Sequence, residues 1–473
     1  MLEGLEVIEL NSKDVYGSLY GRFDAEFFNK KYIENEKSLD FKQSVFLSEL
    51  AVITDGEHGS PDLDDESGII YLSGNNVKDN QIDFGNVRYC AEKLHVKNAR
   101  SSVKKNTVLM SIVGTVGKAS VVHDDVIANT DRNVATIKPN TLINPHYLSI
   151  FLNCKFGTNQ TDRFSTGNVQ PLLNLSQLKQ IKICNFGMGF QCAIAELSQA
   201  QDEKLKQSKA SYTQAEQTLL VAVGLADFKP STQNTNIKTF AQSFGTSGRL
   251  DAEYYQPKYD YLEKVFNQFE RIKLQDLVNY PISSGITPKA GGDDYTDAGN
   301  GVPFVRAVDL QNGLVSIDNF NYIKPEIHTG VLKRTQLKQN DFLFSIAGTV
   351  GRCAIFEHTF EANINQAVAI LRFNDARVNP YYLMMFFNSS IGKEFVGKYS
   401  RQGLQTNLNL SEVGDLSIPI IDLATQTNIS QLVQQSFTLK AQSEHLLSVA
   451  KRAVEMAIEQ DEAAARRFIE NSQ

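Results

Sequence analysis

Residues 114–118, Gly-Thr-Val-Gly-Lys, combine paired glycines with a basic side chain, which is the chemistry of a loop that holds a phosphate. A nucleotide-hydrolysing loop needs four residues between the first glycine and Gly-Lys, then Ser or Thr and a helix. Here two residues intervene, Ala119 follows, and the flanks are β-like; the equivalent residues 348–352 end in Arg352. We therefore expect neither nucleotide hydrolysis nor an RNA-binding Gly-x-x-Gly loop, which joins two helices.

A second pattern, Asn-Pro-x-Tyr, occurs at residues 144–147 and again at residues 379–382. It resembles the Asn-Pro-Pro-Tyr signature with which amino-methyltransferases hold the target amine, but both copies lack the second proline. No glycine-rich cofactor loop with a following acidic residue stands upstream. Asn as a helix cap, with Pro at the first helical position, explains both copies, so the pattern predicts two helix starts.

One further group has metal-binding residue types, because His58 lies close in sequence to Asp55 and Glu57. The equivalent residues 280–287 hold no such group, and no cluster with metal-ligand spacing recurs in both halves of the chain. A solvated loop is the favoured interpretation. Since no catalytic constellation is found, we expect the chain not to be an enzyme and to hold no metal or cofactor of its own.

These patterns recur because much of the chain is duplicated. Four blocks return in the same order: Gly-Arg-x-Asp-Ala-Glu at 21–26 and 248–253, Ser-Ile-x-Gly-Thr-Val-Gly-Lys/Arg at 111–118 and 345–352, Asn-Pro-x-Tyr-Leu at 144–148 and 379–383, and Gln-x-x-Leu-Asn-Leu-Ser at 170–176 and 405–411. The offsets are 227, 234, 235 and 235 residues. Solenoid repeats are only about 20–50 residues long, so the pattern indicates duplication of a whole domain.

Each copy predicts the same series of elements. Short runs rich in Val, Ile and aromatic residues, such as 109–113 and 342–346, indicate strands joined by tight turns at the paired glycines. Each copy ends in an amphipathic helical segment whose apolar spacing is interrupted by polar residues, among them Ser208 and Ser443. A helix of about 33 residues is a rod of about 50 Å.

These elements define the domain boundaries. The prediction is a first globular domain at 1–187, a central helical spacer at 188–225, a linker at 226–246, a second globular domain at 247–421, and a C-terminal helical spacer at 422–473. The fold class is α+β, with two tandem-duplicated domains of mixed β-sheet and helices, each followed by a long helix. We expect the two helices to pack as an antiparallel coiled coil with pseudo-twofold symmetry, which the backbone of duplex DNA shares.

The composition is typical of a soluble, cytoplasmic protein. Its 473 residues, 42% of them hydrophobic, are enough for two to four domains. No run approaches the roughly 20 apolar residues of a membrane span, and the first residues do not resemble a secretory signal. The five cysteines are scattered, which favours buried thiols in a reducing compartment.

The charge is unevenly distributed. A net charge of −7 is unusual for a nucleic-acid binder that acts alone. Residues 86–118, however, carry a net charge of +6, and the matching residues 319–352 carry +3. These segments are interpreted equally well as two basic patches on an acidic body or as solvated turns and strand edges.

Several polar positions recur in both copies and suit recognition. A Lys or Arg follows each glycine pair, Asn129 and Asn363 occupy equivalent positions, and a Gln precedes each Leu-Asn-Leu-Ser. Arg and Lys suit guanine or phosphate, and Gln or Asn suits adenine, although such residues also cap turns and satisfy buried backbone. The candidate DNA-binding residues are Lys104, Lys105, Lys118, Arg132, Arg163, Gln170, Lys333, Arg334, Arg352, Gln366, Arg401 and Gln405. By contrast, residues 54–65 and 283–297 scarcely resemble each other. This is expected if the two copies share a scaffold but recognise different targets.

The doubled glycine block, the Asn-Pro-x-Tyr-Leu helix start, the Gln-x-x-Leu-Asn-Leu-Ser block and the closing helices together resemble the specificity (S) subunit of a type I restriction-modification system, over roughly residues 21–460. In that family each globular domain is a target recognition domain that reads one half of a bipartite DNA site, and the helices fix the gap. The resemblance implies a non-catalytic subunit whose partners are duplex DNA, two methyltransferase (M) subunits and restriction (R) subunits. It places adenine-N6 methylation, S-adenosylmethionine and ATP on those partners.

Three alternatives remain open at this stage. The Gly-Arg-x-Asp-Ala-Glu opening is similar to S-like subunits of several restriction systems, so a related type IIB-like or phage-defence methyltransferase complex is one alternative. The second is a methyltransferase or restriction enzyme in its own right, against which the missing cofactor loop argues. The third is an RNA-binding module.

Overall fold

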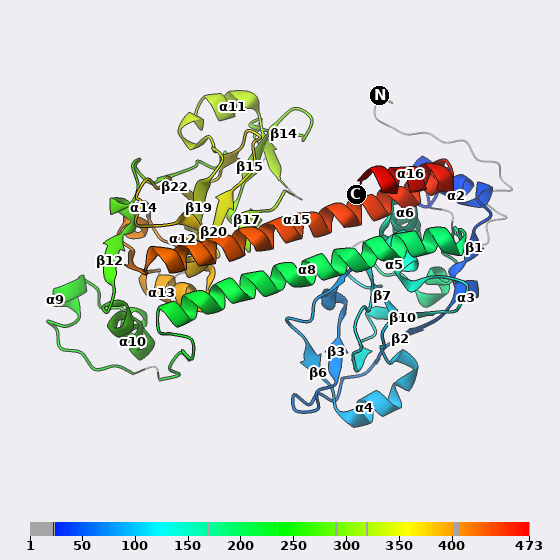
Figure 1. Ribbon diagram of the computed structural model, residues 1–473, viewed down its shortest axis with the longest axis horizontal. Helices are drawn as coiled ribbons and strands as arrows, with labels where there is room; N and C mark the ends of the chain where they lie inside the picture. The colour runs from blue at the N-terminus through cyan, green and yellow to red at the C-terminus, as the bar shows by residue number, and fades with distance from the viewer. Residues whose placement is uncertain are drawn as a thin grey trace. The chain divides into compact units, whose positions relative to one another are not determined.

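The computed structural model describes residues 22, 24–167, 170–233, 235–288, 292–317, 320–400 and 406–472. Their contacts divide the chain into two compact units. Unit 1 contains residues 1–207 and 439–473, and unit 2 contains residues 208–438. Each unit therefore holds one copy of the duplicated segment and a part of each long helix, α8 (Met188–Ala222) and α15 (Leu423–Glu459), which are labelled in Figure 1.

Unit 1 is built on a four-stranded antiparallel sheet in the order β2-β10-β7-β8. A second sheet has the order β6-β3-β9, and two short pairs are β4-β5 and β1-β11. The strands are β1 (Val45–Phe46), β2 (Ala51–Asp55), β3 (Ile70–Leu72), β4 (Val77–Lys78), β5 (Gln81–Ile82), β6 (Arg88–Tyr89), β7 (Val108–Ser111), β8 (Ala119–Val121), β9 (Ala128–Thr130), β10 (Val134–Pro139) and β11 (Lys182–Ile183). The shorter helices are α2 (Lys30–Phe41), α3 (Leu47–Leu50), α4 (Glu92–Lys97), α5 (Pro145–Asn153), α6 (Lys155–Phe164), α7 (Leu175–Leu178) and α16 (Glu462–Ser472), with 3₁₀ turns η1 (Gly74–Asn76) and η2 (Ala99–Ser101).

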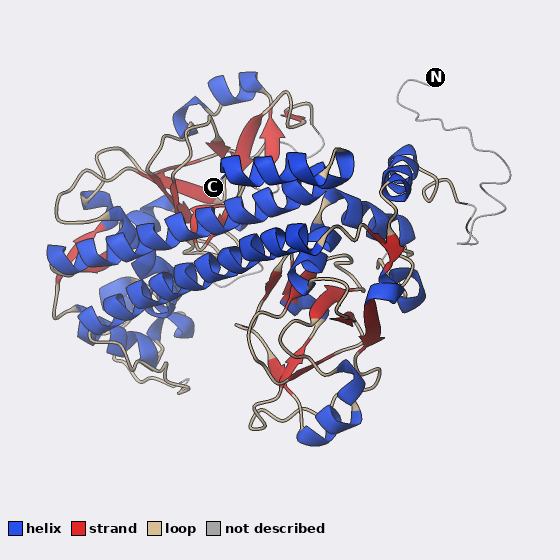
Figure 2. Cartoon of the chain, turned by 45° about the vertical axis from the view of Figure 1, so that its right-hand side comes forward, coloured by secondary structure: helices blue, strands red, loops and turns tan. Residues whose placement is uncertain are grey.

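Unit 2 repeats this plan. Its main sheet begins β13-β22-β19-β20, as β2-β10-β7-β8 does, and continues into β17-β16; its second sheet has the order β14-β18-β15-β21. The strands are β12 (Glu270–Lys273), β13 (Ser283–Ser284), β14 (Tyr295–Thr296), β15 (Val302–Val305), β16 (Leu310–Gln311), β17 (Gly313–Val315), β18 (Asn321–Ile323), β19 (Asp341–Ser345), β20 (Cys353–Phe356), β21 (Asn363–Ile364), β22 (Val368–Leu371) and β23 (Ser417–Ile420). The shorter helices are α9 (Phe244–Ser247), α10 (Pro257–Phe266), α11 (Pro325–Thr329), α12 (Pro380–Asn388), α13 (Ser390–Tyr399) and α14 (Leu410–Gly414), with 3₁₀ turns η3 (Ala252–Tyr255), η4 (Leu274–Asp276), η5 (Ala307–Asp309) and η6 (Lys333–Thr335). Figure 2 distinguishes the helices from the strands. The predicted α+β duplication is confirmed.

The two Asn-Pro-x-Tyr patterns are helix starts, as predicted. The side chain of Asn144 accepts hydrogen bonds from the backbone N–H groups of residues 146 and 147 at 2.9 and 3.4 Å, with Pro145 at the first position of α5. Asn379 caps α12 in the same way. Both tyrosines are buried, and the hydroxyl of Tyr147 donates to a backbone carbonyl at 2.6 Å. These residues therefore hold the core together.

The paired glycines form tight β-connections, also as predicted. Gly114 and Gly117 have φ values of 78° and 91°, and Gly348 and Gly351 have 78° and 87°. This left-handed region strains other residues, and the match shows that both copies use the same turn. Each turn closes by a 2.9 Å hydrogen bond from its second glycine to the serine that ends the preceding strand.

The long helices pack against each other inside each unit. In unit 1 the start of α8, with Phe190 and Ile194, shares a core with the end of α15, with Ala450 and Val454. In unit 2 the end of α8 shares a core with the start of α15. The two helices are therefore antiparallel, as expected for a coiled coil, while their pseudo-twofold symmetry stays a prediction.

Polar residues between the helices hydrogen-bond to each other. In unit 1, Gln201 donates to the hydroxyl of Ser443 at 3.1 Å, and that hydroxyl donates to the carbonyl of Gln201 at 2.9 Å. In unit 2, the hydroxyl of Ser208 donates to the carbonyl of Ser436 at 2.8 Å. All four residues are buried, so these polar positions are not available as a docking face for other proteins.

The C-terminal spacer is two helices, because α15 ends at Glu459 and α16 begins at Glu462. The side chain of Asp461 accepts a hydrogen bond from a backbone N–H in the first turn of α16 at 2.8 Å. Four cysteines are buried as expected, but Cys192 is exposed on α8. Among the helices described, none has the length and apolar character needed to cross a membrane.

Candidate nucleic-acid interface

Each unit holds a pair of a histidine and a buried asparagine that sequence reasoning missed. In unit 1, Asn129 on β9 contacts His95 of α4 and donates to the carbonyl of Asn98 at 3.1 Å. Asn129 is almost fully buried. The pair therefore fixes α4 and the following turn η2 against the edge of the second sheet.

Unit 2 contains the equivalent pair. Asn363 on β21 lies 3.0 Å from the Nδ1 atom of His328 on α11 and donates to the carbonyl of Leu332 at 3.1 Å. The hydroxyl of Thr335 donates to Asn363 at 2.6 Å. Asn129 and Asn363 are thus part of the buried frame, so of the two roles that the sequence left open they satisfy buried backbone. The sequence held a signal for these pairs: His95 and His328 are 233 residues apart, which is close to the offset of the duplication.

A glycine fixes the loop that lies beside each pair. A Cβ atom on Gly56 would lie 1.7 Å from the carbonyl oxygen of Thr130, and one on Gly285 would lie 1.8 Å from that of Ile364. Real Cβ atoms do not approach so closely, so both loops require glycine at this point. The pairing registers also correspond, because Asp55 lies opposite Ala135 and Ser284 lies opposite Ala369.

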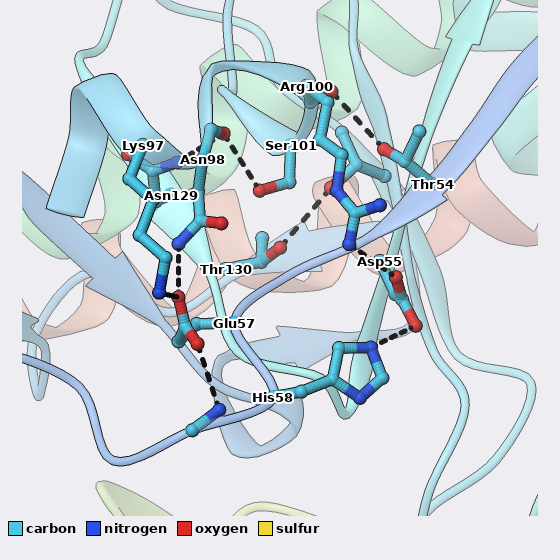
Figure 3. A network of polar contacts seen from close by, with 12 residues as sticks. Thr54, Asp55, Glu57, His58, Lys97, Asn98, Arg100, Ser101, Asn129 and Thr130 are labelled. Atoms are coloured by element: carbon cyan, nitrogen blue, oxygen red, sulfur yellow. Dashed lines mark hydrogen bonds and ion pairs between the residues drawn. The ribbon is translucent and has the colours of Figure 1, made fainter.

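We call residues 54–59, 97–101 and Arg132 of unit 1 loop cluster 1. Figure 3 shows side chains of its first two segments. Hydrogen bonds join its segments: the hydroxyl of Thr54 donates to the carbonyl of Arg100 at 3.3 Å, and the backbone N–H of Arg132 donates to the carbonyl of Glu57 at 3.1 Å. We call residues 283–288, 331–335 and Gln366 of unit 2 loop cluster 2, whose strand β13 packs beside η6.

Glu57 organises one side of loop cluster 1. One of its oxygens accepts hydrogen bonds from Asn98 at 2.6 Å and from Lys97 at 3.2 Å, and the other accepts from the backbone N–H of Gly59 at 2.9 Å. The hydrogen bonds from Asn98 and Gly59, together with the charge of Lys97, lower the pKa of Glu57 to about 2. Glu57 is therefore a carboxylate at neutral pH.

Asp55 organises the other side. Its carboxylate lies 2.8 Å from the Nε2 atom of His58 and 3.7 Å from the guanidinium of Arg100. The carboxylates of Asp55 and Glu57 are largely covered, whereas the side chains of His58, Arg100 and Lys97 are 60%, 63% and 67% exposed. Two covered acids thus hold three basic groups that face the solvent. No group of three metal-ligand residues is found among the described residues.

Loop cluster 2 has the same backbone frame but a different exposed surface. Ile286, like Glu57, directly follows the matching glycine, and Val331, like Lys97, directly precedes the residue whose carbonyl bonds the buried asparagine. These apolar residues are 55% and 68% exposed. Gln366 takes the place of Arg132, and its backbone N–H donates to the hydroxyl of Thr287 at 3.4 Å. Arg334 is equivalent to Arg100, and both are exposed.

The structure sorts the sequence candidates into groups. Arg132 lies in loop cluster 1, and Lys333, Arg334 and Gln366 lie in loop cluster 2. The DNA-binding candidates chosen from the sequence did not include Arg100, His58 or Lys97. Arg100 could have been found from the sequence, because it is equivalent to the candidate Arg334. Lys118 and Arg352 follow the glycine turns, which join β7 to β8 and β19 to β20 at the same end of each sheet as the loop cluster. Gln170 is exposed beside the first glycine turn, since Gly114 bonds to the carbonyl of Pro171 at 2.9 Å.

The remaining candidates lie elsewhere. Lys104 and Lys105 are exposed in the turn that enters β7, at the other end of the sheet. Arg163 is 7% exposed; its guanidinium binds Glu36 at 2.7 Å and the carbonyl of Phe27 at 2.9 Å. Arg163 therefore joins α6 to α2 and the preceding turn, and its assignment as a DNA contact is corrected to a structural role. Arg401 and Gln405 lie outside the described residues.

Comparison with known proteins gives the family. The model of the type I restriction modification DNA specificity domain matches residues 42–184 and 267–447, one segment for each copy of the duplication. The specificity subunit of the Escherichia coli type I restriction enzyme EcoBI is 26% identical over 166 residues, which is 35% of this chain and 34% of that subunit. The chain thus matches about a third of that relative's length.

Two solved structures are also similar. The S subunit of a type I restriction-modification system from M. genitalium has 14% identity and a TM-score of 0.43, over 88% of this chain and 94% of that one. The HsdS subunit from Thermoanaerobacter tengcongensis has 15% identity and a TM-score of 0.26, over 88% and 96%. With both copies of its duplicated domain matched by one family model, the chain belongs to the family of type I restriction-modification DNA specificity proteins.

Proposed function

We propose that this chain is a non-catalytic subunit that gives a type I restriction-modification complex its DNA sequence specificity. Each copy of the duplicated domain reads one half of a bipartite site in duplex DNA. The observation that carries the proposal is that the family domain occurs twice, on matching buried frames whose exposed loops differ. Matching frames suit the symmetric backbone of the duplex, and different loops imply an asymmetric base sequence.

The long helices can set the distance between the two half-sites on the DNA. α8 has 35 residues, so its axis is about 52 Å long at about 1.5 Å per residue. One turn of duplex is about 34–36 Å long, so a helix of this length spans roughly one and a half turns. The helices pack through buried apolar and hydrogen-bonded residues, which makes them a stiff spacer.

The partners follow from the same assignment. Two M subunits dock on the chain and methylate adenine N6 with S-adenosylmethionine, and R subunits join with ATP to cleave. The net charge of −7 is compatible with this role, because partner subunits contribute to neutralising the phosphates. An S-like role in a related methyltransferase complex is the second candidate, because the Gly-Arg-x-Asp-Ala-Glu opening is shared with such systems.

A domain exchange tests the proposal. Residues 21–183 are replaced by the corresponding domain of a relative with a different site, the complex is assembled with its M subunits, and the methylated sites are mapped by sequencing. We expect one half-site to change and the other to stay, and the reciprocal exchange of residues 247–421 should alter only the other half. A change in both halves would contradict independent reading. Methylation by the purified chain alone, with labelled S-adenosylmethionine and DNA, would refute the non-catalytic role.

A further inference from the structure

The two loop clusters provide an internal comparison, because the same backbone frame carries two sets of side chains. What the two units share is the histidine–asparagine pair beside each cluster, the glycine at 56 or 285 and the exposed arginine at 100 or 334. The exposed side chains differ: Arg132 against Gln366, Lys97 against Val331, and His58 against Thr287, while the largely covered Glu57 is replaced by the exposed Ile286. Contacts to the DNA backbone are the same at any sequence, whereas contacts to bases differ.

We propose, on the basis of the function proposed above, that the loop clusters are the base-reading surfaces and that they read different bases. Loop cluster 1 reads guanine through Arg132, and loop cluster 2 reads an A·T pair through Gln366. The equivalent residues Arg100 and Arg334 hold phosphate in both halves.

The chemistry of loop cluster 1 supports the first assignment. Arg makes two parallel hydrogen bonds to the O6 and N7 atoms of guanine in the major groove. Around Arg132 the neighbouring exposed groups are also hydrogen-bond donors, and two covered carboxylates hold them: Asp55 holds His58, and Glu57 holds Lys97. Groups that are already ordered lose less conformational entropy on binding, which favours a specific contact.

The chemistry of loop cluster 2 supports the second assignment. The amide of Gln makes a paired contact to the N6 and N7 atoms of adenine, and apolar side chains contact the methyl group of thymine. Ile286 and Val331 supply apolar side chains at the positions that carry Glu57 and Lys97 in unit 1. A guanine-rich half-site presents no methyl group to these residues, whereas an A·T pair does.

The equivalence of positions 132 and 366 allows a reciprocal test. The assembled complex with its M subunits selects duplexes from a random library, and the bound sequences give the base preference of each half. Arg132→Gln should convert a guanine preference to adenine in one half only, and Gln366→Arg should convert adenine to guanine in the other. Each change should lower the discrimination for the original base roughly 5- to 150-fold. Lys37→Gln on α2, an exposed cation outside both clusters, is the control.

Arg100→Ala separates phosphate contacts from base contacts. It should weaken binding to all sequences alike and reduce the slope of log affinity against log salt by about 1. The inference is overturned if Arg132→Gln and Gln366→Arg leave both half-sites unchanged, or weaken all sequences alike. If the wild-type complex selects no bipartite duplex, the proposed function itself fails, so the two failures are distinguishable. Melting curves of the variants that match the wild type exclude unfolding as the cause. His58→Ala changes a second exposed residue of loop cluster 1, and it should alter the base preference of the first half-site only.

Discussion

His146 gives unit 1 a pH dependence through a buried imidazole. The imidazole lies at the start of α5, buried against α8, with the ring of His123 centred 4.9 Å away and with Asp202 and Lys105 as charged groups that act on it. In unit 2 the equivalent positions hold Tyr381 and Glu357, joined by a 2.8 Å hydrogen bond from the tyrosine hydroxyl. Burial, followed by the neighbouring His123, lowers the pKa of His146 to about 4 from an ordinary value of 6.5.

The sign and size of the effect follow from proton linkage. Between about pH 4 and pH 6.5 the unfolded chain binds a proton at His146 that the folded chain does not, so stability falls as pH falls through this window. For these two pKa values the loss between pH 7.5 and pH 5 is about 2 kcal/mol. The neighbouring His123, whose pKa burial also lowers, changes stability in the same direction.

Urea unfolding followed by circular dichroism measures this loss. The full chain and His146→Gln are unfolded at pH 7.5 and at pH 5, and only the difference between the two pH values is compared. The wild type should lose about 2 kcal/mol more than the variant, because glutamine does not titrate. Equal losses in the two proteins would refute the argument that a buried neutral imidazole causes the effect. Glu57 does not interfere, since its stabilisation is lost between pH 4.5 and about 2.

Two further substitutions test the buried frame. Gly56→Ala should destabilise unit 1 by about 1–3 kcal/mol or more, because its Cβ would meet the carbonyl of Thr130 at 1.7 Å. Gly85→Ala, which would meet only an exposed side chain at 3.3 Å, is the matched control, and equal melting temperatures in both variants would contradict the close approach. Asn363→Ala should cost about 2–4 kcal/mol in denaturant unfolding, because it leaves buried hydrogen-bonding groups unpaired. A cost below about 0.5 kcal/mol, the level of a surface substitution, would show that the asparagine is not part of the frame.

The sequence predicted the scaffold well because the scaffold depends on local chemistry. An asparagine before a proline caps a helix wherever it occurs, and Asn144 and Asn379 do so. Glycines that need a left-handed conformation recur at 114 and 348 because no other residue fits without strain. The apolar spacing of the long helices likewise predicted residues that are buried, among them Ile194 and Val454.

Residue roles were harder to predict from the sequence, because a role depends on what surrounds a side chain. Arg163 carries the charge of a DNA contact but is buried against Glu36, which lies 127 residues away in the chain. The sequence left open whether Asn129 recognises a ligand or satisfies buried backbone, and the structure shows it bonded inside the protein. Conversely, Arg100 and His58 are in no recognisable motif, and they become neighbours only because both bind the carboxylate of Asp55.

The sequence alone determined that one domain is present twice, in which order its elements run, and where its helices begin, since repeats, caps and apolar periods are properties of neighbouring residues. Only the tertiary structure decided which polar side chains are buried and hydrogen-bonded inside the protein and which are exposed to solvent. Strand pairing brings residues 57, 98 and 132 to one place, although the chain separates them by tens of residues. The physical reason is that burial and long-range hydrogen bonding are set by the packing of whole elements, which no local pattern records.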